Sequence, residues 1–250
     1  MSQIRALRKL MIVQTRLYLR EPIGVFFTLL LAPLLLIMMG FIFGNDPVPM
    51  FGGRGQLDVN VPAYAAIVIG VIGLVTVPIE TSGRREAGVL RRFRATPLRP
   101  LTYMAGDVLV YFAMTALGIL LLFLLGRIVY QVQFYGSLLA LMAGICLSAA
   151  AFLALGYVLA SLAPNARVAT VVGNVLFFPM MILSGTTLPL EMMPETVYNV
   201  SRFIPLTHVV TLLRGLWFGE SFSEHLIEVA VLGGVLVGGT IIAAWMFRWE

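Results

Sequence analysis

The chain alternates between long apolar stretches and shorter polar ones. Six of the apolar stretches, among the 250 residues, are long enough to cross a bilayer. About 20 apolar residues in a helix span the hydrocarbon core, and a helix satisfies its own backbone groups within lipid. We therefore predict an all-α integral membrane protein with six transmembrane helices, over residues 23–44, 61–80, 103–125, 136–162, 168–187 and 226–247.

The first twenty residues follow the pattern of an amphipathic helix. Wound at about 100° per residue, they place five basic side chains on one face: Arg5, Arg8, Lys9, Arg16 and Arg20. The opposite face is apolar and consists of Ile4, Leu7, Leu10, Met11, Leu17 and Tyr18. Such a helix suits the anionic interface of a membrane, and the alternative is a solvated basic tail that only sets orientation. Glu21-Pro22 is expected to end the helix.

Composition agrees with a single membrane domain over residues 1–250. Hydrophobic residues make up 60% of the chain and charged residues 12%, whereas soluble domains average about 25% charged residues. The net charge of +5 comes from residues that cluster beside the apolar stretches. Membrane orientation explains that clustering better than a surface for nucleic acid. If both termini are cytoplasmic, thirteen of the seventeen Lys and Arg residues lie on the cytoplasmic side, so we predict this orientation.

The chain lacks the residue patterns of an enzyme. It has no G-x-x-x-x-G-K-[ST] motif, and Lys9 is its only lysine. His208 and His225 have no neighbours at metal-ligand spacing, and no nucleophile and base stand together. The centres of the predicted spans carry no ionisable residue, which argues against a carrier driven by protons or ions. We expect no catalytic, metal or cofactor site here, and energy for uphill transport would come from another chain.

The main basic segment lies between the second and third apolar stretches. Ser82 is suited to cap a helix that begins at Gly83 and that Pro97 would end, which predicts a cytoplasmic helix over 83–97. On a helical wheel Val89, Leu90 and Phe93 share one side with Glu86. The segment also carries the arginines Arg84, Arg85, Arg91, Arg92 and Arg94. Two interpretations stay open from these residues alone: a basic membrane anchor, or a docking helix with an apolar and acidic face for a partner protein.

Two motifs in this order resemble those of ABC-2-type transporter permeases, closest to the drug- and antibiotic-resistance branch typified by daunorubicin exporters. Residues 86–90 and 95–98 are similar to the family's E-x-G-T-L and A-T-P-L signature, with Val89 in place of Thr. Residues 177–215 resemble the end of that family's fifth span and its outer segment. Asp107 stands where a Lys or Arg is frequent in the family, and we expect it to pair with Arg84 or Arg99.

The resemblance implies a type V ABC exporter-like architecture in a bacterial inner membrane. ATP and Mg²⁺ would be held by a separate ABC ATPase subunit, and a second permease, identical or a sister chain, would complete the pair. The coupling helix seated in the ATPase would be formed by Glu86, Gly88, Val89, Leu90, Phe93, Thr96 and Pro97. The N-terminal helix would brace the ATPase. Residues 188–225 would form outer re-entrant helices, in an outer gate segment that includes Ser184, Gly185, Pro189, Pro194, Pro205 and Arg214.

The implied function is export of a hydrophobic or amphipathic substrate such as a drug, antibiotic or lipid. An exporter of polysaccharide or teichoic acid is the alternative that shares topology and coupling loop. A scaffold or sensor that recruits a cytoplasmic partner without transport is a second alternative. An intramembrane enzyme is a third, but it lacks any catalytic cluster.

Overall fold

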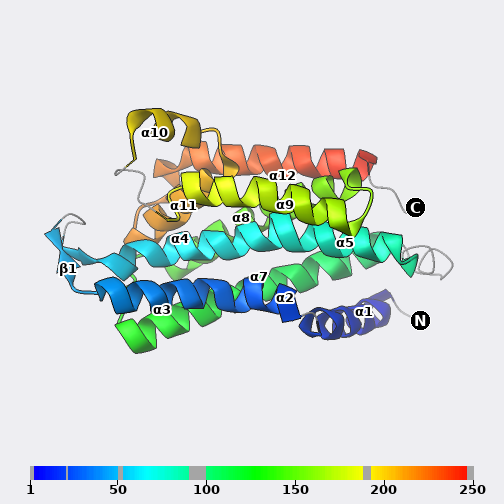
Figure 1. Ribbon diagram of the computed structural model, residues 1–250, viewed down its shortest axis with the longest axis horizontal. Coiled ribbons are helices and arrows are strands. Elements are labelled where there is room, and N and C mark those ends of the chain that lie inside the picture. Colours follow the sequence, from blue (N-terminus) through cyan, green and yellow to red (C-terminus); the bar gives the residue numbers. More distant parts are fainter. Residues whose placement is uncertain (1–2, 21, 50–52, 90–99, 188–192, 247–250) are drawn as a thin grey trace.

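A computed structural model describes residues 3–20, 22–49, 53–89, 100–187 and 193–246. The long helices run along the long axis of the molecule. The start of α1 (Gln3–Leu19) and the end of α12 (Leu226–Met246) lie at the same end of it (Figure 1). We call this end of the bundle the termini end. Six helical segments are long and apolar enough to cross a membrane, which confirms the predicted number of spans.

Several spans are built from more than one helical element. Span one comprises α2 (Pro22–Val25), a π-helical turn η1 (Phe26–Leu30) and α3 (Leu31–Phe43), and span two comprises α4 (Gln56–Gly70), η3 (Val71–Thr76) and α5 (Val77–Glu86). Single helices form the other four: α7 (Pro100–Tyr130), α8 (Leu138–Leu162), α9 (Ala166–Leu183) and α12 (Leu226–Met246). The predicted boundaries lie within a few residues of these except in span two, which is longer at both ends than the predicted 61–80.

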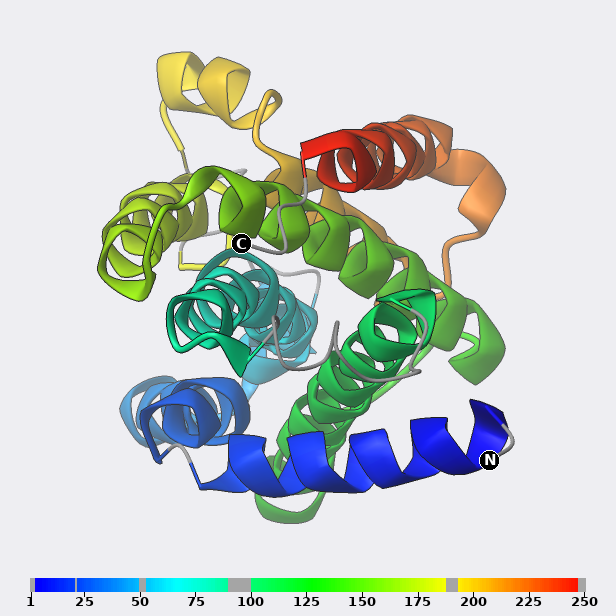
Figure 2. The same ribbon diagram turned by 90° about the vertical axis from the view of Figure 1, so that its right-hand side faces the viewer.

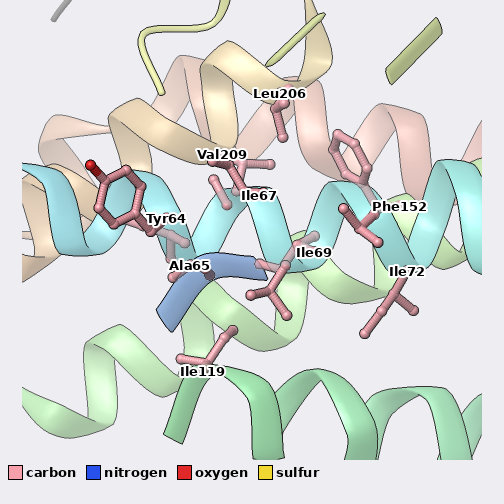
Figure 3. Packing of buried hydrophobic residues seen from close by; sticks show 14 of the residues in the cluster. Tyr64, Ala65, Ile67, Ile69, Ile72, Ile119, Phe152, Leu206 and Val209 are labelled. Carbon is pink, nitrogen blue, oxygen red and sulfur yellow. The ribbon is translucent and has the colours of Figure 1, made fainter. Parts of the chain in front are cut away.

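Span two is the centre of the bundle. In the most apolar 18-residue stretch of span two, 89% of the residues are buried. In the corresponding stretches of α9 and α12 only 17% are buried. Seen along the bundle, the other helices surround α4 and α5 (Figure 2). Ile67, Ile69 and Ile72 of span two pack with side chains from α7, α8 and α11 (Figure 3). A helix enclosed in this way transmits any displacement to several neighbours at once.

Glycines permit the closest approach, where span two crosses α8. A Cβ on Gly73 would lie 2.6 Å from the carbonyl oxygen of Phe152, and one on Gly156 would overlap the carbonyl oxygen of Gly73. Small residues at such crossings bring backbones together, which is the usual means of close packing between membrane helices. At the periphery of the bundle, α12 packs along α8.

The predicted amphipathic helix is present as α1 (Gln3–Leu19). It lies across the termini end of the bundle, beneath α7 in the end view (Figure 2). Leu10 and Tyr18 of the predicted apolar face are buried, together with Gln14, whereas Leu17 of that face is exposed. The buried side chains follow one another every fourth residue, so a single stripe of α1 packs on the bundle.

At the opposite end of the bundle, short elements connect the spans. β1 (Pro47–Val48) and β2 (Arg54–Gly55) form a small antiparallel hairpin before span two. Between α9 and α12 lie α10 (Glu195–Ser201), α11 (Pro205–Phe218) and the 3-10 turn η5 (Phe222–Glu224). α11 packs against α4, α8 and α12, and nine of its fourteen residues are buried. The helix therefore packs into the bundle, and the predicted re-entry of residues 188–225 into the membrane stays a prediction.

Candidate coupling site at the termini end

The start of the predicted helix over 83–97 is wrong. Span two continues without a break through Gly83 to Glu86, and Ser82 is a buried residue inside α5 instead of a helix cap. Its hydroxyl has no hydrogen-bond partner within the described ranges. The amide of Ala87 still donates to the carbonyl of Gly83, at 2.9 Å, because this turn is helical.

The chain leaves the helix at Gly88. The amide of Gly88 donates to the carbonyl of Arg85 at 3.0 Å, and its φ of +68° is one that glycine adopts without a Cβ penalty. Val89 follows, half-buried. The rest of the predicted coupling and basic residues lie outside the described residues: Leu90, Arg91, Arg92, Phe93, Arg94, Thr96 and Pro97. The glycine of the E-x-G-x-L motif is therefore the point where span two ends.

A buried charged network lies one turn before this point. The guanidinium of Arg84 contacts Glu80 Oε2 at 2.7 Å and Asp107 Oδ1 at 2.5 Å. The hydroxyl of Tyr111 donates to Glu80 Oε2 at 2.9 Å, and that of Tyr157 donates to Asp107 Oδ2 at 3.0 Å. The side chains of Glu80, Asp107 and Arg84 are only 8%, 4% and 16% exposed. The network joins α5, α7 and α8, that is, spans two, three and four.

The chemistry of this network explains why it tolerates burial. Two carboxylates face one guanidinium, and two tyrosine hydroxyls supply further donors to the carboxylate oxygens. Buried ion pairs are costly to desolvate and hold together only when additional hydrogen bonds satisfy them. Removing the Arg84 guanidinium, the cation that the described residues place in this network, would leave two carboxylates close together in a buried site.

The next two residues contact the connection between spans four and five. The guanidinium of Arg85 donates to the carbonyl of Ala163, and Glu86 Oε2 accepts from the amide of Ala166 at 3.2 Å. Ala166 is the first residue of α9, where a carboxylate is favoured by the helix dipole. Glu86 is itself exposed. The end of span two is thus tied to every span from three to five.

Sequence reasoning found part of this site. Arg84 is one of the two partners predicted for Asp107 and forms an ion pair with it, whereas Arg99, the other, lies outside the described residues. Arg84 is also one of the arginines predicted to lie at the membrane interface, but its guanidinium lies in the buried network. Glu80, Tyr111 and Tyr157 were missed. The available signal was the spacing of four residues between Glu80 and Arg84, which places them on one helix face.

Apart from Arg85 of α5, the remaining predicted interface residues lie on α1, directly after it at Arg20, or outside the described residues. Arg8, Arg16 and Arg20 are exposed, and Arg5 and Lys9 belong to the same helix.

The predicted outer gate residues occupy the ends of helices. Ser184 caps the C-terminus of α9, Gly185 follows with φ of +86°, Pro194 precedes α10 and Pro205 is the first residue of α11. Arg214 lies on α11, and Pro189 lies outside the described residues. Nearby, the hydroxyl and amide of Ser221 donate to Glu224 and hold the pKa of that carboxyl below its ordinary value. In the described ranges no three His, Cys, Asp or Glu side chains converge on a metal position.

A family model described as ABC-2 type transporter matches residues 5–218, which include all of span two, the network and α11. The chain belongs to the ABC-2 type transporter family. It is therefore a multi-pass membrane permease, and such a permease is not itself an enzyme. Within the family, permeases pair with ABC ATPase subunits.

Two relatives of this ABC-2 permease carry names of transport proteins. The chain is 25% identical to the probable multidrug ABC transporter permease YbhS of Escherichia coli over 67% of its own length and 45% of the relative. It is 24% identical to the inner membrane transport permease YhhJ of the same species, over 82% of this chain and 57% of the relative. Nodulation protein J of Rhizobium leguminosarum is 26% identical over 42% of this chain and 40% of the relative. The matched part spans about half the length of these curated relatives.

Proposed function

We propose that this chain is the transmembrane subunit of an ATP-driven exporter that moves a hydrophobic or amphipathic substrate out of the cytoplasm or inner leaflet. The observation that carries the proposal is the continuity of span two with the E-x-G-x-L segment. Span two continues as a helix to Glu86, the first residue of that segment, so a push on Glu86 would act directly on the buried central helix.

The charged network supports the same role. Arg84 lies two residues before Glu86 and connects α5 to α7 and α8 through Asp107 and Tyr157. A displacement of the segment would therefore move spans two, three and four together, because a buried ion pair resists separation. Glu86 and Arg85 extend the connection to the start of α9.

The energy source would be a separate ABC ATPase subunit that holds ATP and Mg²⁺. In this arrangement both termini are cytoplasmic, the coupling segment docks in the ATPase, and α1 braces it from the side. A second permease, identical or a sister chain, would complete the translocation path in a bacterial inner membrane.

A drug, antibiotic or lipid is the substrate class that we favour. YbhS, one of the relatives, is named a probable multidrug permease, and the motifs of this chain resemble the antibiotic-resistance branch. Stimulation by polysaccharide or teichoic acid precursors instead would assign the chain to the alternative class with the same topology.

Co-purification tests the proposal directly. The full chain is expressed with candidate ABC ATPases from the same genome, and ATPase activity is measured in lipid discs with hydrophobic, lipid and polysaccharide substrates. We expect one ATPase to bind wild-type protein and to lose binding when Glu86→Arg is combined with Phe93→Asp. The coupling assignment fails if no ATPase binds the wild type or if binding survives the double substitution. Arg16→Glu, on the exposed side of α1, serves as a charge-reversal control.

A further inference from the structure

The end of the bundle opposite the termini contains a pocket of about 670 Å³. Its walls come from four separate segments: β2, the start of α10, the C-terminal half of α11 and the turn that precedes α12. The pocket belongs to neither the coupling segment nor the network. Among its lining residues, Arg214 is the one predicted as part of the outer gate segment.

Arg54 is the most distinctive side chain in this pocket. Its guanidinium carbon lies 3.9 Å from the centre of the Phe218 ring and 5.9 Å from that of Tyr135. Among the described residues the side chain of Arg54 makes no ion pair and no hydrogen bond. A guanidinium stacked on a ring is held in place while its N–H donors stay directed outward along its edge, the geometry that suits a phosphate or carboxylate.

Two carboxylates, Glu220 and Glu195, line the same pocket as this guanidinium. Glu220 Oε2 lies 2.8 Å from His225 Nε2, so this carboxylate already has a partner. Gly215 makes room for that pair, because a Cβ there would overlap the imidazole. Glu195 and Arg54 are both exposed, where water screens their charges. Arg214 brings a second guanidinium to the wall.

Apolar surface lies beside the cationic wall. Phe218, Val210 and Tyr198 line the same pocket. A ligand that matches both features carries an anionic head and an apolar body.

We propose that this pocket binds the phosphate or carboxylate head of an amphiphile, with Arg54 as the principal contact. The ligand comes either from the surrounding membrane, as an anionic lipid, or from solution, as a soluble amphiphile. The proposal does not rest on export, because binding at this site needs no ATPase partner.

The test uses the purified full chain in phosphatidylcholine discs. Dihexanoyl-phosphatidylglycerol and inorganic phosphate are titrated calorimetrically, and lipids retained from mixed phosphatidylglycerol–phosphatidylcholine discs are counted by native mass spectrometry. We expect Arg54→Gln to weaken binding of the phosphatidylglycerol probe about tenfold, the effect of losing a charge-assisted hydrogen bond. Glu195→Gln should strengthen binding, since it removes a negative charge from the rim. Arg202→Gln is the control: the guanidinium of Arg202 lies 5.7 Å from the ring of Tyr198, a pocket residue, but Arg202 itself does not line the pocket.

The outcomes distinguish the two possible sources of the ligand and show which results overturn the proposal. Retained phosphatidylglycerol that Arg54→Gln releases identifies a membrane lipid, whereas an Arg54-dependent response confined to the soluble probes identifies a soluble ligand. No binding by wild-type protein, or an equal loss in Arg54→Gln and Arg202→Gln, overturns the proposal. Arg54→Lys guards against misfolding: it keeps the charge and is expected to retain part of the affinity. A loss of ATPase docking in the coupling experiment leaves these results unaffected.

Discussion

Arg84 of span two and Asp107 of span three form a buried ion pair with 2.5 Å between Nη1 and Oδ1, and Glu80 and two tyrosine hydroxyls complete its surroundings. Arg84 lies at the end of the central helix, two residues before the E-x-G-x-L segment that resembles the family's motif. Its position makes the end of span two a fixed part of the bundle instead of a loosely attached helix.

Arg84→Gln should destabilise the protein strongly. Removing one partner of a buried ion pair costs about 3–5 kcal/mol, and here two carboxylates would remain near each other without a cation. Thermal unfolding of the detergent-purified chain measures the loss. Combining Arg84→Gln with Glu80→Gln and Asp107→Asn removes all three charges and should recover much of the stability. Arg16→Gln, which changes an exposed arginine of α1, is the control; equal effects from the two arginines would contradict a buried network.

Gly156→Ala should destabilise the crossing of span two and α8. The added Cβ overlaps the carbonyl oxygen of Gly73, and overpacking of this kind costs about 1–3 kcal/mol. Gly234→Ala is the matched control in α12, because a Cβ there meets nothing within 4 Å. The control should keep or slightly raise the unfolding temperature, since alanine favours a helix over glycine. A similar unfolding temperature for both variants would rule out a close crossing at Gly73.

Cysteine labelling checks the orientation. In a Cys146→Ser background, Phe203→Cys places a thiol on a side chain that is 89% exposed at the end opposite the termini. Arg20→Cys places one on exposed surface at the termini end. With cytoplasmic termini, a membrane-impermeant maleimide should label Phe203→Cys in intact spheroplasts and Arg20→Cys only after lysis. The reverse pattern would require the inverted topology.

The fold was largely predictable because hydrophobic length and basic flanks are properties of single segments. The six spans and α1 follow from such local patterns. What the sequence did not predict depends on pairing between segments. Span two extends beyond 80 with Glu80 paired to Arg84, and Arg84 also pairs with Asp107 of another helix. Asp107, Tyr111 and Tyr157 come from α7 and α8, and no local pattern shows their contacts with this pair. The same holds for Arg54, whose ring partner Phe218 lies more than 160 positions along the chain.

The N-terminal helix is expected to contribute to ATPase binding more than to membrane insertion. Tyr18 is buried, its hydroxyl donates to Thr28 Oγ1 at 2.5 Å, and its ring meets that of Tyr111 edge-on with 6.3 Å between centroids. Tyr111 in turn donates to Glu80, so α1 contacts the network that holds the end of span two.

Deleting residues 2–18 leaves all six spans intact, and the chain should still reach the membrane fraction. The deletion removes the brace, and the amount of co-purified ATPase should fall several-fold. Tyr18→Phe keeps the ring contact and loses only the hydroxyl, so it should retain most of the ATPase. Normal assembly after the deletion would return residues 2–20 to the alternative of a basic tail that sets orientation alone.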